Sequence, residues 1–319
     1  MKAKLFKISG VLGRALVGII LGLLGAGTIT AQQTVPAAGS LAQPTNAAPV
    51  VIPRATQYDL PSRINGQTYR IMVSLPFMFD PAAAYPVLYV LDANTIFGIV
   101  TDVAHFQSFA KVTAPAIVVG IGYPTDDLNE WVRRRALDMT PTPSPKPDKA
   151  GKNGGGDAFL RVIDEEVKPF LATRYKIDRS KQIIFGFSLG GLIALRNLFR
   201  NPTAFATYIL ASPSIWWDNK TVLADEEAFS KRARSGDLLL TVILTSARDE
   251  QYHDNDPKLL AEAQSGSRMV DNASEIAARL TALNPEKIKV FRVIFDGEIH
   301  NTVTAAAVSR GLRLALPPK

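Results

Sequence analysis

The feature that most constrains the fold is the segment 186–191, which reads Gly-Phe-Ser-Leu-Gly-Gly. It lies between an apolar run at 183–185, typical of a strand, and a run at 192–195 that favours a helix. The pattern G-x-S-x-G in this context predicts a nucleophile elbow, a strained turn that projects the Ser188 hydroxyl above the end of a sheet. Glycines on both sides leave room for the close chain crossing. The helix N-terminus faces this site, so the backbone N–H of Leu189 is a candidate oxyanion donor.

Strand-like and helix-like segments alternate along the chain. The apolar runs that we expect to be strands lie at 69–75, 86–91, 116–121, 183–185, 208–211, 238–244 and 290–294. The segments that we expect to be helical lie at 155–172, 190–200, 219–234, 258–283 and 310–315. Such alternation predicts an α/β protein with a mostly parallel central sheet and helices on both faces, which is the α/β-hydrolase architecture. The one long irregular stretch, at 138–156, is rich in proline and glycine.

The N-terminus has the order of a secretory signal. Basic residues without any acidic residue precede an apolar run at 15–26, and small residues follow up to Ala31. We therefore expect a signal peptide at 1–31; because Ile29 is a poor residue at the −3 position, an uncleaved anchor is the alternative. Residues 32–54, rich in Ala, Pro and Gln, are expected to form a flexible linker. A single catalytic domain at 55–319 would then be periplasmic or secreted.

Composition excludes several classes of function. The chain has 36 basic and 29 acidic residues, a net charge of +7, but four of the basic residues fall in the leader. The remainder has 32 basic against 29 acidic residues, a net charge of +3, so we expect no nucleic-acid partner. There is no cysteine, and hence no disulfide. Neither a P-loop, nor H-E-x-x-H, nor a dinucleotide-binding fingerprint occurs, so we expect no cofactor and no metal.

A serine nucleophile needs a base, and the chain has three histidines. In α/β-hydrolases the order along the chain is serine, acid, histidine. His300 fits this order, since it follows the expected strand at 290–294. His105 precedes the serine on an apolar stretch and is expected to be a core residue, whereas His253 lies in a polar loop.

The orienting acid and the second oxyanion donor can be placed only approximately. The loop at 247–251 follows the strand before the expected acid and offers two adjacent carboxylates, Asp249 and Glu250. Spacing alone does not separate them. The turn after the strand at 86–91 makes the backbone N–H of Asn94 the candidate for the second donor.

Four stretches resemble one known family. Residues 85–94, 135–141, 186–191 and 212–217 are similar to the putative-esterase branch of the α/β-hydrolases, especially periplasmic siderophore esterases of the salmochelin and enterobactin type. The resemblance implies Ser188 as nucleophile and His300 as base. Because the family often has G-x-x-E-Q at 247–251, it also favours Glu250 over Asp249 as the acid, although some members look like Ser–His dyads.

The same resemblance suggests how a substrate binds. Arg135, with Arg133 and Arg134, is a candidate for binding an anionic substrate such as a ferric catecholate, and a solvated basic face is the alternative. Trp216 and Trp217 are candidates for an aromatic pocket, with a core anchor beside an exposed ring as the alternative. The expected ligand is a small-molecule ester, ferric siderophores included. The hypotheses are therefore an ester hydrolase, a serine acyltransferase on the same fold, or a binding protein that has lost catalysis.

Overall fold

The computed structural model describes residues 48–144, 151–252 and 267–318, and the central element of this part is a sheet of eight strands. The strands are β1 (Ala55–Pro61), β2 (Thr68–Ser74), β3 (Tyr85–Val90), β4 (Ile117–Gly122), β5 (Ile177–Phe187), β6 (Thr207–Ala211), β7 (Leu240–Ala247) and β8 (Ile288–Phe295). Their order is β1-β2-β4-β3-β5-β6-β7-β8. Only the pairings β1–β2 and β2–β4 are antiparallel, and β4 through β8 run parallel.

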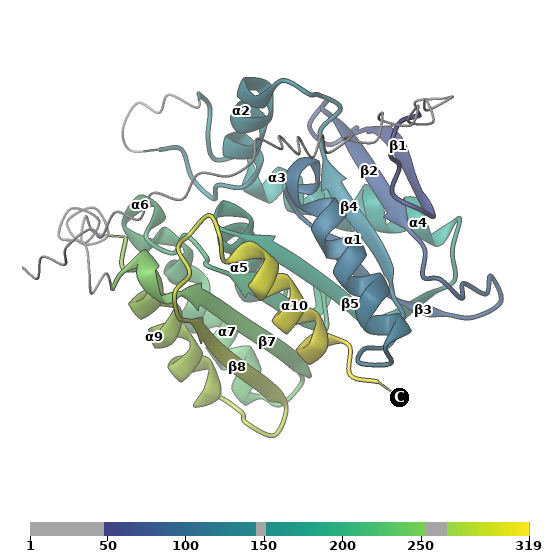
Figure 1. Ribbon diagram of the computed structural model, residues 1–319. Helices are drawn as coiled ribbons and strands as arrows, with labels where there is room; N and C mark the ends of the chain where they lie inside the picture. The colour runs from purple at the N-terminus through teal and green to yellow at the C-terminus, as the bar shows by residue number, and fades with distance from the viewer. Residues whose placement is uncertain (1–47, 145–150, 253–266, 319) are drawn as a thin grey trace, which may run out of the picture. The chain divides into compact units, whose positions relative to one another are not determined.

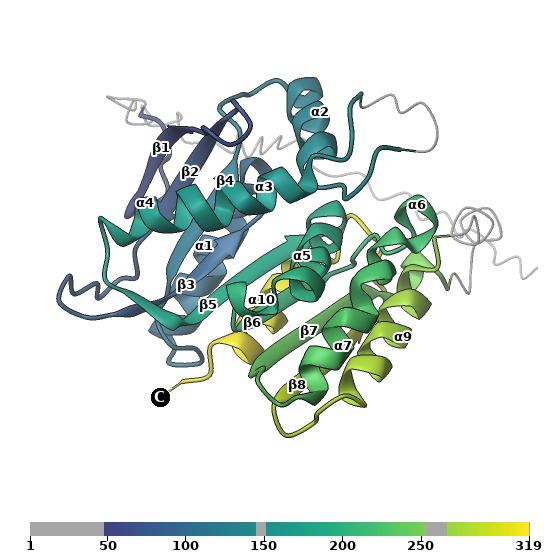
Figure 2. The ribbon, with the colours of Figure 1, turned by 180° about the vertical axis from the view of Figure 1, so that it is seen from behind.

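Helices cover both faces of this sheet, as expected for a parallel sheet with crossover connections. The helices are α1 (Ala93–Phe109), α2 (Leu128–Asp138), α3 (Gly156–Val162), α4 (Lys168–Ala172), α5 (Leu189–Arg200), α6 (Trp217–Lys220), α7 (Glu226–Arg234), α9 (Met269–Thr281) and α10 (Thr304–Ala315). Helices α1 and α10 pack together on one face, in front in Figure 1. The opposite face, in front in Figure 2, carries α3, α4, α5, α7 and α9. The chain thus has the α/β-hydrolase fold that its sequence predicts.

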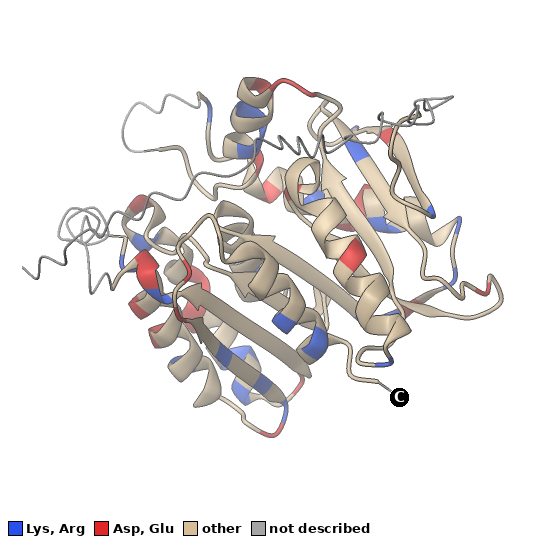
Figure 3. Ribbon diagram, in the orientation of Figure 1, with Lys and Arg blue, Asp and Glu red and all other residues tan. Residues whose placement is uncertain are grey.

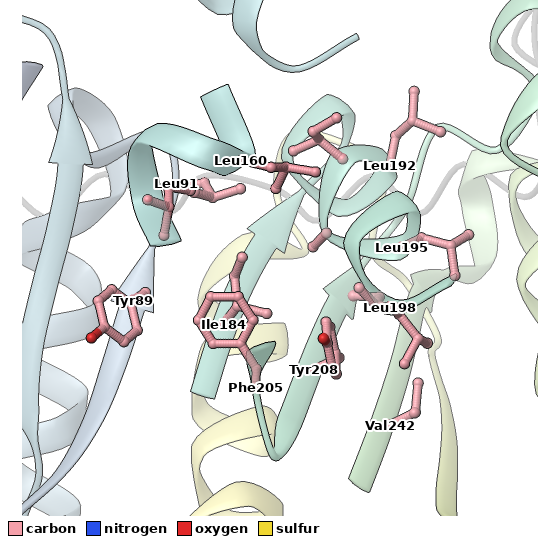
Figure 4. Close-up of a cluster of buried hydrophobic side chains, with 14 of the residues drawn as sticks. Tyr89, Leu91, Leu160, Ile184, Leu192, Leu195, Leu198, Phe205, Tyr208 and Val242 are labelled. Atoms are coloured by element: carbon pink, nitrogen blue, oxygen red, sulfur yellow. The ribbon is translucent and has the colours of Figure 1, made fainter. Parts of the chain in front are cut away.

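The core consists of two apolar layers, one on each face of the sheet. Figure 4 shows part of the layer beneath α5, where Ile184, Tyr208 and Val242 of successive strands lie near Leu195 and Leu198 of the helix. All five side chains are fully buried. Burying side chains of this size stabilises the fold by about 1.5–3 kcal/mol each. This packing fixes the strand ends from which the candidate site residues project.

Several elements differ from the sequence-based expectation. The strand expected at 183–185 begins six residues earlier, as β5, and the helix expected at 155–172 is α3 and α4 joined by a π-helical turn at Ile163–Val167. Helix α1 was not expected at all. Its buried face includes the polar residues Thr101 and His105, which interrupt the apolar pattern that signals a helix.

The leader predicted at 1–31, and most of the linker predicted at 32–54, lie outside the described residues, as does the first part of the helix predicted at 258–283. Within the described part, no helix is long and apolar enough to cross a membrane. Lys and Arg are interspersed with Asp and Glu over the helices and strands seen in Figure 3.

Candidate active site

The strained turn between β5 and α5 presents Ser188. Its backbone has φ 59° and ψ −117°, a conformation that non-glycine residues rarely adopt. The Ser188 N–H donates to the carbonyl of Ala211 at the end of β6 (2.9 Å), which ties the turn to the neighbouring strand. A Cβ atom at Gly186 would lie 2.1 Å from the carbonyl oxygen of Gly190, so the chain crossing requires glycine there. As the first residue of α5, Leu189 has a backbone N–H with no acceptor one turn earlier in the helix.

The structure brings three side chains from distant parts of the sequence together above the strand ends. Nε2 of His300 lies 3.0 Å from Oγ of Ser188, and Nδ1 of the same ring lies 2.6 Å from Oε1 of Glu250. These residues follow β5, β7 and β8, three strands of the parallel part of the sheet. Carboxyl ends of parallel strands are the usual position of ligand sites in such folds. The arrangement has the geometry of a nucleophile, a base and an orienting acid.

Of the two adjacent carboxylates, the structure directs Glu250 to the histidine. Its side chain is 1% exposed, and Oε2 accepts a hydrogen bond from the Ala247 N–H (3.1 Å). Asp249 points elsewhere: its side chain is 29% exposed, and its backbone N–H donates to the carbonyl of Glu298. The difference arises because the 3-10 turn Arg248–Glu250 separates the directions of neighbouring side chains.

Two further residues contact the Ser188–His300 pair. The ring of Phe187 packs against the imidazole, with centroids 4.7 Å apart and planes tilted by 31°. Oγ of Ser214, a buried residue after β6, lies 3.3 Å from Oγ of Ser188. Phe187 limits the rotation of the His300 ring, and Ser214 is a second hydroxyl within hydrogen-bond reach of Oγ of Ser188.

A cavity of about 530 Å³ opens beside Ser188 and His300. Its other lining residues include Asp92, Ile96, Trp131, Arg135, Phe187 and Thr304. The size and the mostly apolar lining suit a drug-sized ligand. A larger cavity, of about 910 Å³, lies at the opposite ends of the strands, and none of the candidate site residues lines it.

Arg135 lines the cavity beside Ser188, but its charge already has a partner. Its Nε and Nη2 atoms donate to the two carboxylate oxygens of Asp92, at 2.7 and 3.1 Å. Burial works to lower the pKa of Arg135, but the Asp92 carboxylate raises that pKa above its usual value. Arg133 is exposed, and Arg134 donates to Gln67 and to the carbonyl of Thr68. The three consecutive arginines therefore do not form one cationic surface at the site.

Asn94 is not among the residues that line the cavity, so the expectation that its backbone N–H supplies an oxyanion donor gains no support from the structure. Its side chain accepts from the N–H of Tyr123 and donates to the carbonyls of Tyr123 and Thr125. The residue thereby joins the start of α1 to the end of β4. On either side of Asn94, Asp92 and Thr95 do line the cavity.

The two tryptophans do not line the cavity either, so the structure does not support an aromatic pocket built from them. Trp217 is buried in the core, and its Nε1 donates to Oγ1 of Thr142 (3.3 Å). Trp216 packs beside it and is 40% exposed. The aromatic rings that do line the cavity belong to Trp131 and Phe187.

His105 is the buried core residue that the sequence predicts, and its Nε2 lies 3.0 Å from the carbonyl oxygen of Leu75. His253 falls outside the described residues. Across the three described ranges, no group of three His, Cys, Asp or Glu side chains could hold a metal ion.

Comparison with known proteins identifies the family. The model of the putative esterase family matches residues 62–280, which is more than half of the chain. The chain belongs to the putative esterase family. Among curated relatives of this esterase-family protein, the ferri-bacillibactin esterase BesA of Bacillus subtilis is 37% identical over 265 residues, covering 81% of this chain and 88% of BesA. The siderophore triacetylfusarinine C esterase of Aspergillus fumigatus is 31% identical over 280 residues, covering 83% and 94%.

Solved structures agree with this assignment. The BES protein from Bacillus cereus superposes with a TM-score of 0.74 at 32% identity, covering 86% of this chain and 99% of that one. The siderophore hydrolase EstB from Aspergillus nidulans gives a TM-score of 0.73 at 28% identity, covering 85% and 97%.

Proposed function

We propose that this esterase-family protein hydrolyses carboxylic esters through a Ser188 acyl-enzyme, with His300 as general base and Glu250 as the acid that orients it. The observation that carries the proposal is the continuous hydrogen-bonded row from Ser188 through His300 to Glu250, at 3.0 and 2.6 Å. A buried carboxylate on Nδ1 keeps that nitrogen protonated and leaves Nε2 free to accept a proton from the serine.

The reaction then proceeds in two balanced halves. His300 takes the hydroxyl proton of Ser188 as Oγ attacks the ester carbonyl, and it returns that proton to the oxygen of the departing alcohol. Water next gives a proton to His300 and attacks the acyl-enzyme, and the proton passes back to Ser188 as the acid leaves. The Leu189 N–H supports the oxyanion in both halves, and losing one such donor typically costs about 10²–10³ in rate.

The relatives support a siderophore ester as the substrate. The names of two of them specify a ferri-bacillibactin esterase and a triacetylfusarinine C esterase. The cavity beside Ser188 is mostly apolar, and the guanidinium of Arg135 in its lining is already paired with Asp92. We therefore propose that the group bound next to the scissile ester carries no charge of its own. The signal-like order of residues 1–31 supports export to the periplasm or the medium.

Comparing wild type with Ser188→Ala tests the proposal. Turnover of p-nitrophenyl butyrate, and of a panel with bacillibactin-type trilactones and triacetylfusarinine-type esters, should fall by at least about 10³-fold in the variant. Ser108→Ala, at the far end of α1, serves as the matched control and should leave turnover unchanged. Unaltered hydrolysis by Ser188→Ala would overturn the mechanism.

The same assay separates the two alternatives. An acyltransferase would give ester products when an alcohol acceptor competes with water, whereas the proposal requires the free acid. A binding protein without catalysis would fail to label with a fluorophosphonate at Ser188.

A further inference from the structure

Arg292 is a partly buried cation on the strand that precedes His300, and nothing in the proposed mechanism uses it. It lies on β8, the edge strand against which α9 packs (Figure 1). Its guanidinium donates five hydrogen bonds of 2.7–3.4 Å, and every acceptor is neutral. The acceptors are the carbonyls of Leu244, Val270 and Val293 and the hydroxyls of Ser246 and Ser274.

This bonding holds the cation in one position without a direct ion pair. Among the described residues, no carboxylate bonds to Arg292. Two of its acceptors lie on β7 and two on α9, so the side chain bridges the strand to the helix beside it. A long side chain held by five bonds has little rotational freedom, so its charge stays where the backbone places it.

This charge is tied to the segment that holds Glu250. Nη2 of Arg292 bonds to Oγ of Ser246 (3.0 Å), and the next residue, Ala247, donates its N–H to the Glu250 carboxylate (3.1 Å). Burial lowers the pKa of Arg292 to about 10, still well above neutrality, and the Glu250 carboxylate opposes that lowering. The two charges therefore act on each other through space at neutral pH.

Other charged groups around the row are engaged elsewhere. On α9, Asp271 accepts from Gln251 and Tyr252, while Glu275 pairs with Arg268. Near the start of the 3-10 turn, Arg248 lies at the surface between Asp249 (4.0 Å) and Asp296 (3.8 Å). Across the cavity, Arg135 is neutralised by Asp92. The described hydrogen bonds of Arg292, by contrast, all go to neutral groups.

We propose that Arg292 is a positioning residue for catalysis, a fixed cation that keeps the Glu250 carboxylate ionised and holds the His300–Glu250 pair in its unprotonated, base-competent state. The inference rests on the proposed function, since it concerns the same base. A carboxylate that is 1% exposed and makes two hydrogen bonds has little contact with water, so a fixed positive charge nearby favours its ionised form.

The sign of the effect does not depend on which member of the pair takes the proton. Adding one proton to the ionised carboxylate and neutral imidazole changes the charge of the pair from −1 to 0. A nearby positive charge opposes that step whether the proton sits on nitrogen or oxygen. Removing the positive charge must therefore favour protonation, and the base should become inactive at a higher pH than in wild type.

The test is the pH profile of kcat/KM for p-nitrophenyl butyrate in matched variants. Arg292→Gln removes the charge but can still hydrogen-bond, and we expect the acid limb to move to higher pH by about one unit, a tenfold loss on the limb. Arg292→Lys retains the charge and should keep the limb near its wild-type position. Arg279→Gln, which removes an exposed cation of α9 paired with Glu226, should not move it.

If Arg292 had only a structural role, replacing it would lower kcat/KM by the same factor at every pH. An acid limb that stays in place in Arg292→Gln, or that moves equally in Arg292→Lys, would overturn the proposal. If Arg292→Gln does not fold, Arg292→Met is a second neutral variant that keeps the apolar stem. A Ser188→Ala variant that turned over substrate as fast as wild type would instead overturn the proposed function itself. The two failures are therefore distinguishable.

Discussion

Arg135 binds the carboxylate of Asp92 through two hydrogen bonds, at 2.7 and 3.1 Å, in the cavity beside Ser188. The Asp92 side chain is 2% exposed, so this ion pair is largely shielded from water. Asp92 lies in the turn between β3 and α1, and its backbone has a positive φ (57°). The pair therefore links α2, which carries Arg135, to the loop that borders the cavity.

Breaking this pair from one side should destabilise the protein strongly. Arg135→Met leaves a buried carboxylate uncompensated, which typically costs about 3 kcal/mol in the free energy of unfolding. Arg161→Met is the control, because its ion pair with Glu165 is exposed to solvent and contributes little to stability. Urea denaturation of both variants measures the difference. Equal losses would show that the Asp92–Arg135 pair does not act as a buried ion pair.

The two adjacent carboxylates of the 3-10 turn should differ sharply in their effect on turnover. Glu250→Gln keeps the shape of the side chain but removes the charge that orients His300, and should lower kcat/KM by about 10²–10⁴. Asp249→Asn changes a group directed away from the histidine and should stay within about threefold of wild type. If Glu250→Gln also stayed within that range, the protein would work as a Ser–His dyad.

The parts of this site that could be predicted from the sequence are those with a local signal. The glycines around Ser188, with a strand before and a helix after, define the elbow within a few residues. His300 follows from its place in the chain, since only one histidine comes after the last expected strand. The alternation of apolar runs similarly determines the parallel sheet.

The remaining contacts depend on side-chain directions that local patterns do not encode. Asp249 and Glu250 are neighbours, and only the 3-10 turn decides which one meets a ring fifty positions later. Trp217 turns into the core and Trp216 outward for a similar reason. Phe187 occupies a variable position of the G-x-S-x-G pattern, so the pattern alone could not predict its contact with His300.

A buried acid at the C-terminal end of α2 should make stability depend on pH. Asp138 is 1% exposed, and burial raises its pKa to about 6, although Tyr69 and Gln67 donate to its carboxylate at 2.9 and 3.0 Å. In the unfolded chain an aspartate titrates near 3.9. The folded state thus binds the proton more tightly, and this contribution to stability is present below about pH 4 and lost as the pH rises through about 6.

Asp138→Asn removes this titration. Between pH 4 and pH 7, the free energy of unfolding of the variant relative to wild type should rise by about 2–3 kcal/mol. Denaturation at both pH values measures this change. Asp59→Asn is a control of opposite sign, because Arg70 holds the pKa of the exposed Asp59 below its usual value. A difference between Asp138→Asn and wild type that is the same at both pH values would contradict the prediction.

Two glycines should respond in opposite ways to the same added methyl group. At Gly186 a Cβ atom would lie 2.1 Å from the Gly190 carbonyl oxygen, a backbone atom that cannot move without opening the turn at Ser188. At Gly98, within α1, the nearest atom would be Cδ1 of Ile52 at 3.8 Å, which is ordinary contact. Because alanine favours the helix over glycine, Gly98→Ala should stabilise the protein by about 0.5–1 kcal/mol.

Gly186→Ala should instead destabilise by at least about 2–3 kcal/mol, as overpacking against backbone does. It should also slow fluorophosphonate labelling of Ser188, since the shift displaces the hydroxyl from His300. Thermal unfolding and labelling rates, measured on both variants, test the pair. Normal labelling and an unchanged melting temperature in Gly186→Ala would mean that the turn tolerates a side chain, and the close crossing of β5 and α5 would not be what positions the nucleophile.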